Sequence, residues 1–312
     1  MRVFATNKND IRPLALTIGN FDGIHRGHQR MLSRLVEVAK EKDLVPSIMT
    51  FNPHPSEFFS ATGVSERLFG TRDKVLACLE RGVERVHILP FNNKYAAMSA
   101  ESFIQDVLVR RLGVRWIIVG DDFRFGASRR GDFKMLQSFG SKFRFEVESM
   151  PSFEVNGVRV SSTLVRDALR SGNLALAQDF LGRRYNVCGR VVHGDQVGRT
   201  LGYPTANIHR KQTTFPLSGV FTALVDGVDL IAKHALVSVG TRPTIVDKGE
   251  VRIEAHLLDF SGDLYGKKIR VTFLEYLRGQ VRFSEREQLI MAMQEDERTA
   301  RQYFLNFSSR IA

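Results

Sequence analysis

The sequence GNFDGIHRGH occupies residues 19–28 and decides how the first half of the chain is interpreted. It joins a short apolar run, residues 14–18, to a helical pattern whose apolar side chains recur on one face between Met31 and Ala39. Its three glycines allow a tight turn and a close approach of the backbone to a ligand. The start of the following helix offers free backbone N–H groups and a positive dipole end, so this turn predicts a phosphate site.

Two histidines in this turn, His25 and His28, are three residues apart and can point to the same side. There they can donate hydrogen bonds to a pentavalent phosphate as it forms. A lone histidine is usually structural, but two of them in a glycine-rich strand-to-helix turn favour phosphate chemistry.

Strands and helices alternate through the rest of this half. Apolar runs at residues 45–51, 83–89 and 116–119 predict strands, and the patterns at 71–81 and 99–112 predict helices. Short strands without polar alternation, separated by helices, predict a parallel sheet covered on both faces and therefore an α/β domain.

The character of the chain changes after two short helical patterns, at residues 162–171 and 174–181. Six segments without intervening helices are then predicted as strands: residues 186–193, 219–225, 228–232, 235–239, 251–258 and 268–276. They predict an antiparallel barrel or sandwich, with Asp226-Gly227 as a hairpin turn. We therefore expect two domains, residues 1–184 and 185–312.

A C-terminal helix is expected to follow the last of these strands. Ser284 and Glu287 have the spacing of a capping box, which predicts that the helix opens there.

The composition is that of a soluble globular protein. The 312 residues include 43% apolar residues, a formal charge of +11 and two cysteines, Cys78 and Cys188. Two distant cysteines give no disulfide framework, no apolar run is long enough to cross a bilayer, and the first residues lack a signal-peptide pattern, so we expect a cytoplasmic protein without a membrane partner. The basic residues are spread along the chain, which leaves nucleic-acid binding open without supporting it.

Three further segments of the first half carry candidate site residues. TFNPHP, residues 50–55, contains Asn52 and His54, and on its residues alone a rigid loop is the favoured interpretation. GDDFRFG, residues 120–126, is suited either to holding a flat heterocycle and a phosphate or to a strand-end turn with core aromatics. SSTLVR, residues 161–166, opens a helix, and its hydroxyls and arginine suit a polyphosphate as well as an ordinary N-cap.

Together these four segments resemble the nucleotidylyltransferase superfamily, and within it the FMN adenylyltransferase module of bifunctional bacterial riboflavin kinase/FAD synthetases. The resemblance implies a Rossmann-like domain in which His25 and His28 stabilise the transition state at the α-phosphate of ATP. The other residues it implies are Gly19, Phe21, Gly27, Ser162, Thr163 and Arg166 for ATP, and Asn52, Asp122 and Phe123 for the flavin.

Two segments of the second half suggest another phosphate site. GRTLGYPTAN, residues 198–207, places Thr205 and Asn207 two residues apart on an extended chain, where their oxygens suit Mg²⁺; a turn followed by an edge strand is an equally good interpretation. In VRIEAHL, residues 251–257, the alternation puts Glu254 on the polar face, as a general base or simply as a solvent-facing carboxylate.

These segments, with PLSGVF and VGTRPT, resemble the riboflavin kinase family, a six-stranded antiparallel barrel with a C-terminal helix. The resemblance implies that Thr205 and Asn207 bind Mg²⁺ and ATP phosphates and that Glu254 deprotonates the ribityl hydroxyl. It also places Gly194, Gly198 and Arg199 near the nucleotide.

Three positions depart from the pattern of the kinase family. Tyr203 stands where phenylalanine is usual, Gln280 replaces a usual acidic residue, and Val237-Ser238-Val239 lacks a usual asparagine. The change at Tyr203 is mild, and we expect the carboxylate lost at Gln280 to affect the affinity of the kinase rather than its chemistry.

The prediction is a bifunctional enzyme that makes FMN from riboflavin and ATP with Mg²⁺, and then FAD from FMN and ATP. It is expected to act on small molecules as a monomer or weak oligomer, without nucleic acid. The alternatives are a different adenylyltransferase and, from another class, a basic RNA-binding barrel protein.

Overall fold

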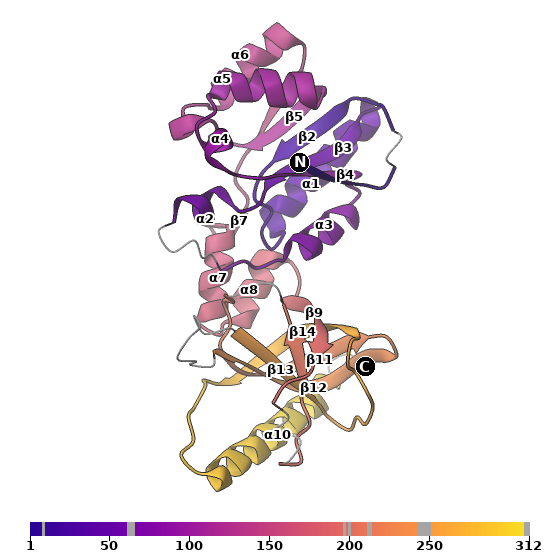
Figure 1. Ribbon diagram of the computed structural model, residues 1–312, viewed down its shortest axis with the longest axis vertical. Helices are drawn as coiled ribbons and strands as arrows, with labels where there is room; N and C mark the ends of the chain where they lie inside the picture. The colour runs from indigo at the N-terminus through magenta and orange to yellow at the C-terminus, as the bar shows by residue number, and fades with distance from the viewer. Residues whose placement is uncertain are drawn as a thin grey trace. The chain divides into compact units, whose positions relative to one another are not determined.

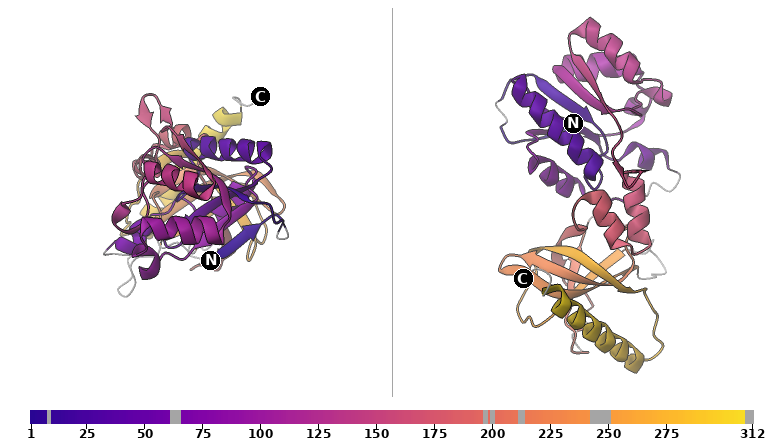
Figure 2. Two further views of the ribbon diagram at one scale, coloured as in Figure 1. Left: turned by 90° about the horizontal axis from the view of Figure 1, so that it is seen from above. Right: turned by 180° about the vertical axis from the view of Figure 1, so that it is seen from behind.

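The computed structural model describes residues 1–7, 10–60, 66–195, 198, 201–210, 214–241 and 251–308. It contains two compact units, and each consists of two stretches of chain. The first comprises Met1–Ser65 and Thr71–Ser162, and the second comprises Glu66–Gly70 and Thr163–Ala312 (Figures 1 and 2).

A six-stranded sheet forms the centre of the first unit, in the order β1-β4-β3-β2-β5-β6. The strands are β1 (Arg2–Ala5), β2 (Leu14–Ile18), β3 (Val45–Phe51), β4 (Arg85–Leu89), β5 (Val114–Gly120) and β6 (Glu146–Met150). All neighbouring strands pair in parallel except β1, which pairs antiparallel with β4. The predicted parallel α/β sheet is confirmed, and the two edge strands β1 and β6 are additions to the prediction.

Helices lie on both faces of this sheet (Figure 2). Those of the first unit are α1 (Arg26–Glu41), α2 (Pro55–Phe59), α3 (Thr71–Leu79), α4 (Asn93–Ala96), α5 (Ala100–Ser102), η1 (Phe103–Arg111), η2 (Ala127–Arg129) and α6 (Phe133–Phe143), and a small hairpin pairs β7 (Glu154–Val155) with β8 (Val158–Arg159). The helix expected at residues 99–112 is a short α-helical turn, α5, continued by the π-helix η1. Ser99 caps its start, because its hydroxyl oxygen accepts from the Ser102 N–H at 3.1 Å.

The strand order reverses beside β2, since the chain adds β3 and β4 on one side of that strand and β5 and β6 on the other. The connections that follow β2 and β5 therefore leave the sheet in opposite directions. In an open parallel sheet this switch point creates a crevice at the carboxyl ends of the strands. The turn at residues 19–28 and the segment at residues 120–126 both begin at this edge.

The second unit contains a closed barrel in the strand order β10-β13-β12-β11-β14-β9. Its strands are β9 (Asn186–Val192), β10 (Ala206–His209), β11 (Gly219–Gly227), β12 (Leu230–Thr241), β13 (Val251–Leu257) and β14 (Lys268–Arg278), and every neighbouring pair is antiparallel. Six strands were predicted and six are present, which settles the choice between barrel and sandwich.

Two of the six strand assignments were nevertheless wrong. The segments predicted at 228–232 and 235–239 form one strand, β12, because Lys233 and His234 continue the ladder opposite Val225 and Leu224. The two polar side chains lie on opposite faces of this strand: the His234 ring stacks on Phe304 at 3.9 Å, and Lys233 is exposed. The sixth strand is β10, which begins at the alanine of the PTAN segment and which the sequence indicated only as an extended chain or as an edge strand after a turn.

The helix α10 (Arg286–Ser308) covers one side of the barrel, where Ala300 and Phe304 pack on Leu236 and Leu274. It begins at Arg286, within the segment predicted as a capping box, and the Ser284 hydroxyl donates to the Gln288 side chain at 3.4 Å. The helices α7 (Ser162–Arg170) and α8 (Leu174–Leu181) precede the barrel, and nearly all of both belongs to its unit. The boundary between two functional domains at residues 184–185 remains a prediction.

Candidate active sites

A cavity of about 530 Å³ opens at the carboxyl edge of the parallel sheet. Gly19 and Asn20 after β2, Phe51 at the end of β3, and Asp122 and Phe123 after β5 contribute to its wall. Three of the four predicted segments therefore meet at the switch point of the sheet.

Aromatic side chains form much of the remaining wall. Phe59, Phe91, Tyr95 and Phe103 line it beside Phe123, whose ring stacks on Phe125 at 5.5 Å. A largely apolar, aromatic cavity with a few polar groups suits a flat heterocycle. The four aromatics from residues 59 to 103 were missed from the sequence, where nothing distinguishes them from core residues.

The two histidines of the GNFDGIHRGH turn stand together at the start of α1. Their rings stack with centroids 3.7 Å apart, and His25 caps the helix by accepting the His28 backbone N–H at its Nδ1, 3.3 Å away. Because His25 Nδ1 accepts, the proton of a neutral His25 ring lies on Nε2. The histidines are side by side, as their spacing predicts.

His28 is held in its neutral form. Burial lowers its pKa well below the ordinary value, and the nearby charges of His25 and Lys74 lower the pKa further. Its Nδ1 is buried and has no hydrogen-bond partner within the part of the chain that is described.

The backbone of this turn takes conformations that few side chains favour. Phe21 and Ile24 have φ angles of 46° and 45° and are fully buried, and residues outside glycine adopt this left-handed region rarely. Gly27 leaves room for a histidine ring, because a Cβ there would lie 3.2 Å from Cε1 of His25, which is tighter than an ordinary contact. Backbone strain of this kind persists only where the surrounding structure enforces it, and it is found most often at functional sites.

The fourth predicted segment is connected to the same turn. The Ser162 hydroxyl donates to the Asp22 carbonyl oxygen at 2.8 Å. The next residues of the segment, Thr163 and Arg166, belong to the second unit, where Arg166 Nε donates to the Glu66 carbonyl oxygen at 2.6 Å.

The predicted flavin residues lie at the same edge of the sheet in different surroundings. Asp122 forms an ion pair with Arg159 at 2.6 Å and contributes to the cavity wall. Asn52 follows β3, and its backbone N–H donates to the Leu89 carbonyl oxygen at 2.9 Å, but its exposed side chain is not in the cavity wall.

In the barrel, the predicted kinase residues come together on the outer face of β10 and β13. Asn207 is directly opposite Glu254 in the ladder, and both alternate with buried neighbours, Ala206 and Ala255, as the sequence predicts. Side chains opposite each other in an antiparallel pair share one face, so the carboxylate and the amide are neighbours. Thr205 lies two residues before Asn207, on the same face.

Glycines bring the backbone against these side chains. A Cβ on Gly194 would lie 2.3 Å from Asn207 Nδ2, and one on Gly198 would lie 2.4 Å from the Tyr203 carbonyl oxygen. Arg199 and residues 242–244 of the VGTRPT segment lie outside the described residues. Hydroxyl, amide and carboxylate oxygens in this glycine-lined setting are the donor set that Mg²⁺ prefers, so the residues present fit the ion.

Gln280 anchors the chain after β14 next to this group. Its Nε2 donates to Ser238 Oγ at 3.0 Å, to the Val239 carbonyl oxygen at 3.0 Å and to the Gly219 carbonyl oxygen at 3.2 Å. Ser238 is directly opposite Glu254. The amide that replaces the acid usual in the kinase family thus ties together the ends of three segments.

A second cavity, of about 580 Å³, adjoins the predicted metal residues. Pro204, Thr205 and Ala206 form one wall, and Asp263 and Tyr265 stand across from them. The Tyr265 ring stacks on His193 at 3.8 Å. A nucleotide base with its phosphates directed toward Thr205 matches this combination of aromatic and polar walls.

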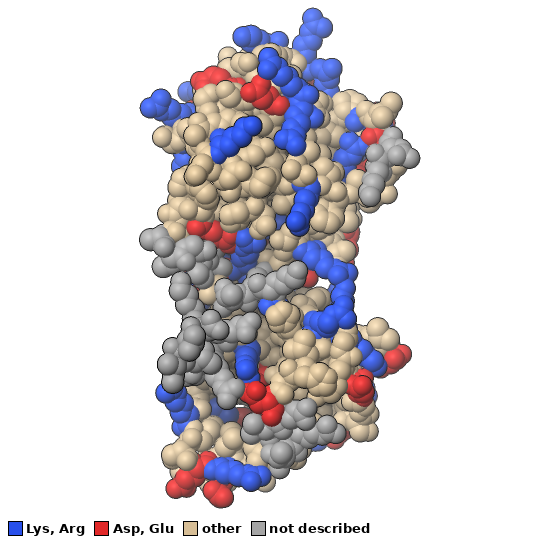
Figure 3. Space-filling view, in the orientation of Figure 1, with Lys and Arg blue, Asp and Glu red and all other residues tan. Residues whose placement is uncertain are grey.

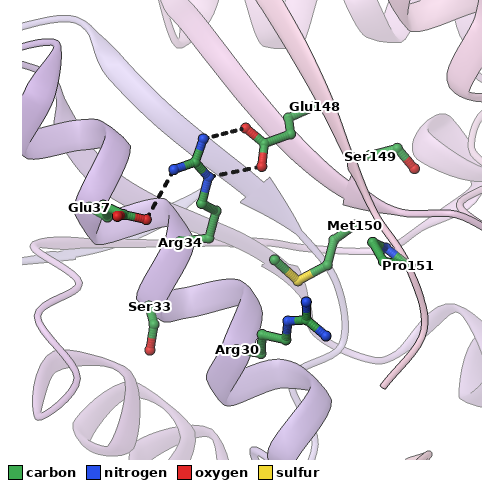
Figure 4. Close-up of a pocket in the computed structure, with 8 residues that line it drawn as sticks. All are labelled: Arg30, Ser33, Arg34, Glu37, Glu148, Ser149, Met150 and Pro151. Carbon is green, nitrogen blue, oxygen red and sulfur yellow. Dashed lines mark hydrogen bonds and ion pairs between the residues drawn. The ribbon is translucent and has the colours of Figure 1, made fainter. Parts of the chain in front are cut away.

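Charged side chains also line a depression elsewhere on the first unit. The depression between α1 and β6 (Figure 4) is crossed by Arg34, which forms a bidentate pair with Glu148 at 2.9 and 3.1 Å and a further bond to Glu37. On the face drawn in Figure 3, lysines and arginines are spread among acidic and uncharged side chains. None of the helices within the described ranges is long and apolar enough to cross a membrane.

Comparison with known proteins agrees with both sites. The FAD synthetase family model matches residues 7–164, and the riboflavin kinase family model matches residues 181–304. The chain is 43% identical over 289 residues to the bifunctional riboflavin kinase/FMN adenylyltransferase of Escherichia coli (strain K12), covering 93% of this chain and 92% of that relative. It is also 43% identical over 290 residues to the protein of the same description from Pseudomonas fluorescens, covering 93% of each.

A solved structure is similar over nearly the whole chain. It is described as a macrolide-efflux protein from Streptococcus pneumoniae, and it matches with a TM-score of 0.79 and 29% identity, covering 95% of this chain and 97% of that one. Both family models, in this order, and relatives matched over nearly their full length lead to one conclusion. The chain belongs to the family of bifunctional riboflavin kinase/FMN adenylyltransferases.

Proposed function

We propose that the first unit transfers the adenylyl group of ATP to FMN beside the stacked histidines. A phosphate oxygen of FMN attacks the α-phosphorus of ATP, the bond from that phosphorus to the bridging oxygen of the β-phosphate breaks, and diphosphate leaves with the electron pair. The attacking group belongs to the substrate, so the protein contributes position and charge stabilisation. The observation that carries the proposal is the pair of stacked imidazole rings at the start of α1, where two potential hydrogen-bond donors stand side by side.

The other residues then bind the two substrates. Gly19, Phe21 and Gly27 shape the turn for ATP, Ser162 holds its phosphates, and Asn52, Asp122 and Phe123 place the flavin. The aromatic cavity supports the flavin assignment, because an isoalloxazine ring is flat and largely apolar.

We propose that the barrel makes the FMN. Glu254 accepts the proton of the terminal ribityl hydroxyl as that oxygen attacks the γ-phosphorus of ATP, and ADP leaves with the electrons of the broken bond. Thr205 and Asn207 would hold Mg²⁺, which neutralises phosphate charge when bound. Gly194, Gly198 and Arg199 give the phosphates close access to the backbone. The pairing of Glu254 with Asn207 supports this arrangement, since base and metal ligand are then adjacent.

The test is a chromatographic time course of riboflavin, ATP and Mg²⁺ with the purified chain. FMN should rise first and then give way to FAD. FMN without FAD would count against the adenylyl transfer site, and no product from either riboflavin or FMN would count against both.

We also propose a cytoplasmic monomer or weak oligomer that has no nucleic-acid partner. Cys78 is buried and its pKa is raised to about 12 by that burial, which suits an unreactive core thiol in a reducing compartment. Size-exclusion chromatography tests the oligomeric state. An RNA affinity that falls steeply with salt would contradict the last part of the proposal.

A further inference from the structure

A buried polar cluster lies behind the histidine turn and has no role in the mechanism above. It consists of Thr50, His54, Glu57 and Lys74, and each is at most 6% exposed. Lys74, on α3, is 3% exposed, although lysine is almost never buried to this extent. A buried ammonium ion is costly to retain unless its contacts are well arranged.

The contacts of Lys74 reach the loop that carries Asn52. Its Nζ lies 3.0 Å from His54 Nε2 and donates to Thr50 Oγ1 at 3.4 Å. The first contact is to the loop between β3 and α2, and the second is to the penultimate residue of β3. The loop is closed from its other end by Glu57, which accepts the His54 backbone N–H at 2.9 Å.

The cluster also reaches the histidine turn. Thr50 Oγ1 donates to the Asn20 carbonyl oxygen at 3.4 Å, so a chain of polar contacts runs from α3 through the end of β3 to the GNFDG segment. The ammonium charge is near enough to His28 to contribute to the lowering of its pKa. Lys74 is therefore placed where the loop for the flavin and the turn for the nucleotide are held together.

We propose that Lys74 is a positioning residue for adenylyl transfer, which holds the loop of Asn52 against the turn of His25 and His28. This inference rests on the proposed function of the first unit. It assigns a role to a residue that is not in the cavity wall and that no segment similarity marks.

The experiment compares Lys74→Met, Lys74→Gln and, as a matched control, Lys40→Met at an exposed position on α1. Each is assayed for FAD formation with FMN and ATP varied separately. Lys74→Met should lower kcat/KM for FMN by about tenfold to a hundredfold, the effect of losing charge-assisted hydrogen bonds. Most of the loss should be in the KM for FMN, and Lys74→Gln, which keeps a donor, should recover part of it.

Folding of the first unit is monitored separately through Trp116, the one tryptophan in the sequence, which lies buried in β5. An unchanged emission maximum together with the raised KM supports the proposal. Activity within twofold of the unaltered chain would overturn it, and so would exposure of Trp116 in both Lys74 variants, because Lys74 would then serve folding in general. An unaltered chain that converts no FMN to FAD would instead refute the proposed function itself.

Discussion

Replacement of Gly194 by alanine tests the kinase site most directly. A Cβ at this position would lie 2.3 Å from Nδ2, 2.5 Å from Cγ and 2.6 Å from Oδ1 of Asn207, whereas ordinary contacts begin near 3.4 Å. The whole amide must therefore move by about 1 Å, or the backbone at Gly194 must withdraw by as much. Magnesium tolerates little change in ligand position, since it requires near-octahedral geometry at about 2.0–2.1 Å.

A displacement of about 1 Å at a positioning group can cost about a hundredfold in rate, or about 2.7 kcal/mol of transition-state stabilisation. We therefore expect Gly194→Ala to lower kcat/KM for riboflavin by about a hundredfold and to raise the Mg²⁺ concentration needed for half-maximal rate. FAD formation from added FMN should be unchanged, because the first unit is untouched.

The assay is the initial rate of FMN formation, separated by chromatography, across riboflavin and Mg²⁺ concentrations. Gly279→Ala is the matched control, since a Cβ there would meet only the Tyr276 hydroxyl, at an ordinary 3.5 Å. If Gly194→Ala kept more than half of the kinase rate, the reasoning that Asn207 must stay in place would be refuted.

Three further outcomes are expected. Glu254→Gln should abolish FMN formation in the same assay while leaving FMN-to-FAD conversion intact, and equal loss of both steps in a folded chain would contradict separate sites. Burial, and to a smaller extent the charges of Arg85 and Arg111, lower the pKa of His87 to about 4. Between pH 6.5 and 4 the unfolded chain therefore binds a proton at His87 that the folded unit does not bind. The free energy of unfolding should fall by about 3 kcal/mol over this range. Urea unfolding of the first unit, followed by tryptophan fluorescence, should show a flatter pH profile for His87→Met. Arg278→Met should destabilise the barrel by about 3 kcal/mol in thermal unfolding, because it leaves Asp296 buried without its bidentate partner at 2.6 and 2.8 Å, and a loss below 1 kcal/mol would show that the pair is dispensable.

The parts of the fold that follow from local pattern were predictable from the sequence. The strand at residues 14–18, the turn after it and the helix that follows are adjacent in the chain, so their apolar periodicity and glycines specify them without knowledge of distant contacts. The alternation around Glu254 is local in the same way. The strand β10 was offered only as one alternative, an edge strand after a turn, because four residues shortly after a proline carry too little pattern to establish a strand.

The parts that depend on distant contacts were not predictable. Phe91 and Tyr95 line the cavity because α4 and the turn before it return to the carboxyl edge of the sheet, and an aromatic residue looks the same in sequence whether it lines a cavity or fills a core. The sequence did not indicate a role for Lys74, because a lysine in a predicted helix is expected to face solvent. The family resemblance assigned separate roles to Asn207 and Glu254 and did not predict that they are adjacent. The register of the ladder makes them neighbours.

The three contacts of Gln280 limit how this chain can change by substitution. All three partners of its Nε2 can accept a hydrogen bond, and two of them, the carbonyl oxygens of Gly219 and Val239, can do nothing else. Restoring the acid that is usual at this position would replace a donor by an acceptor of negative charge, directed at two carbonyl oxygens. The Gln280 amide is therefore complementary to the strand ends around it. A carboxylate at this position would leave stability unchanged only if neighbouring residues changed as well.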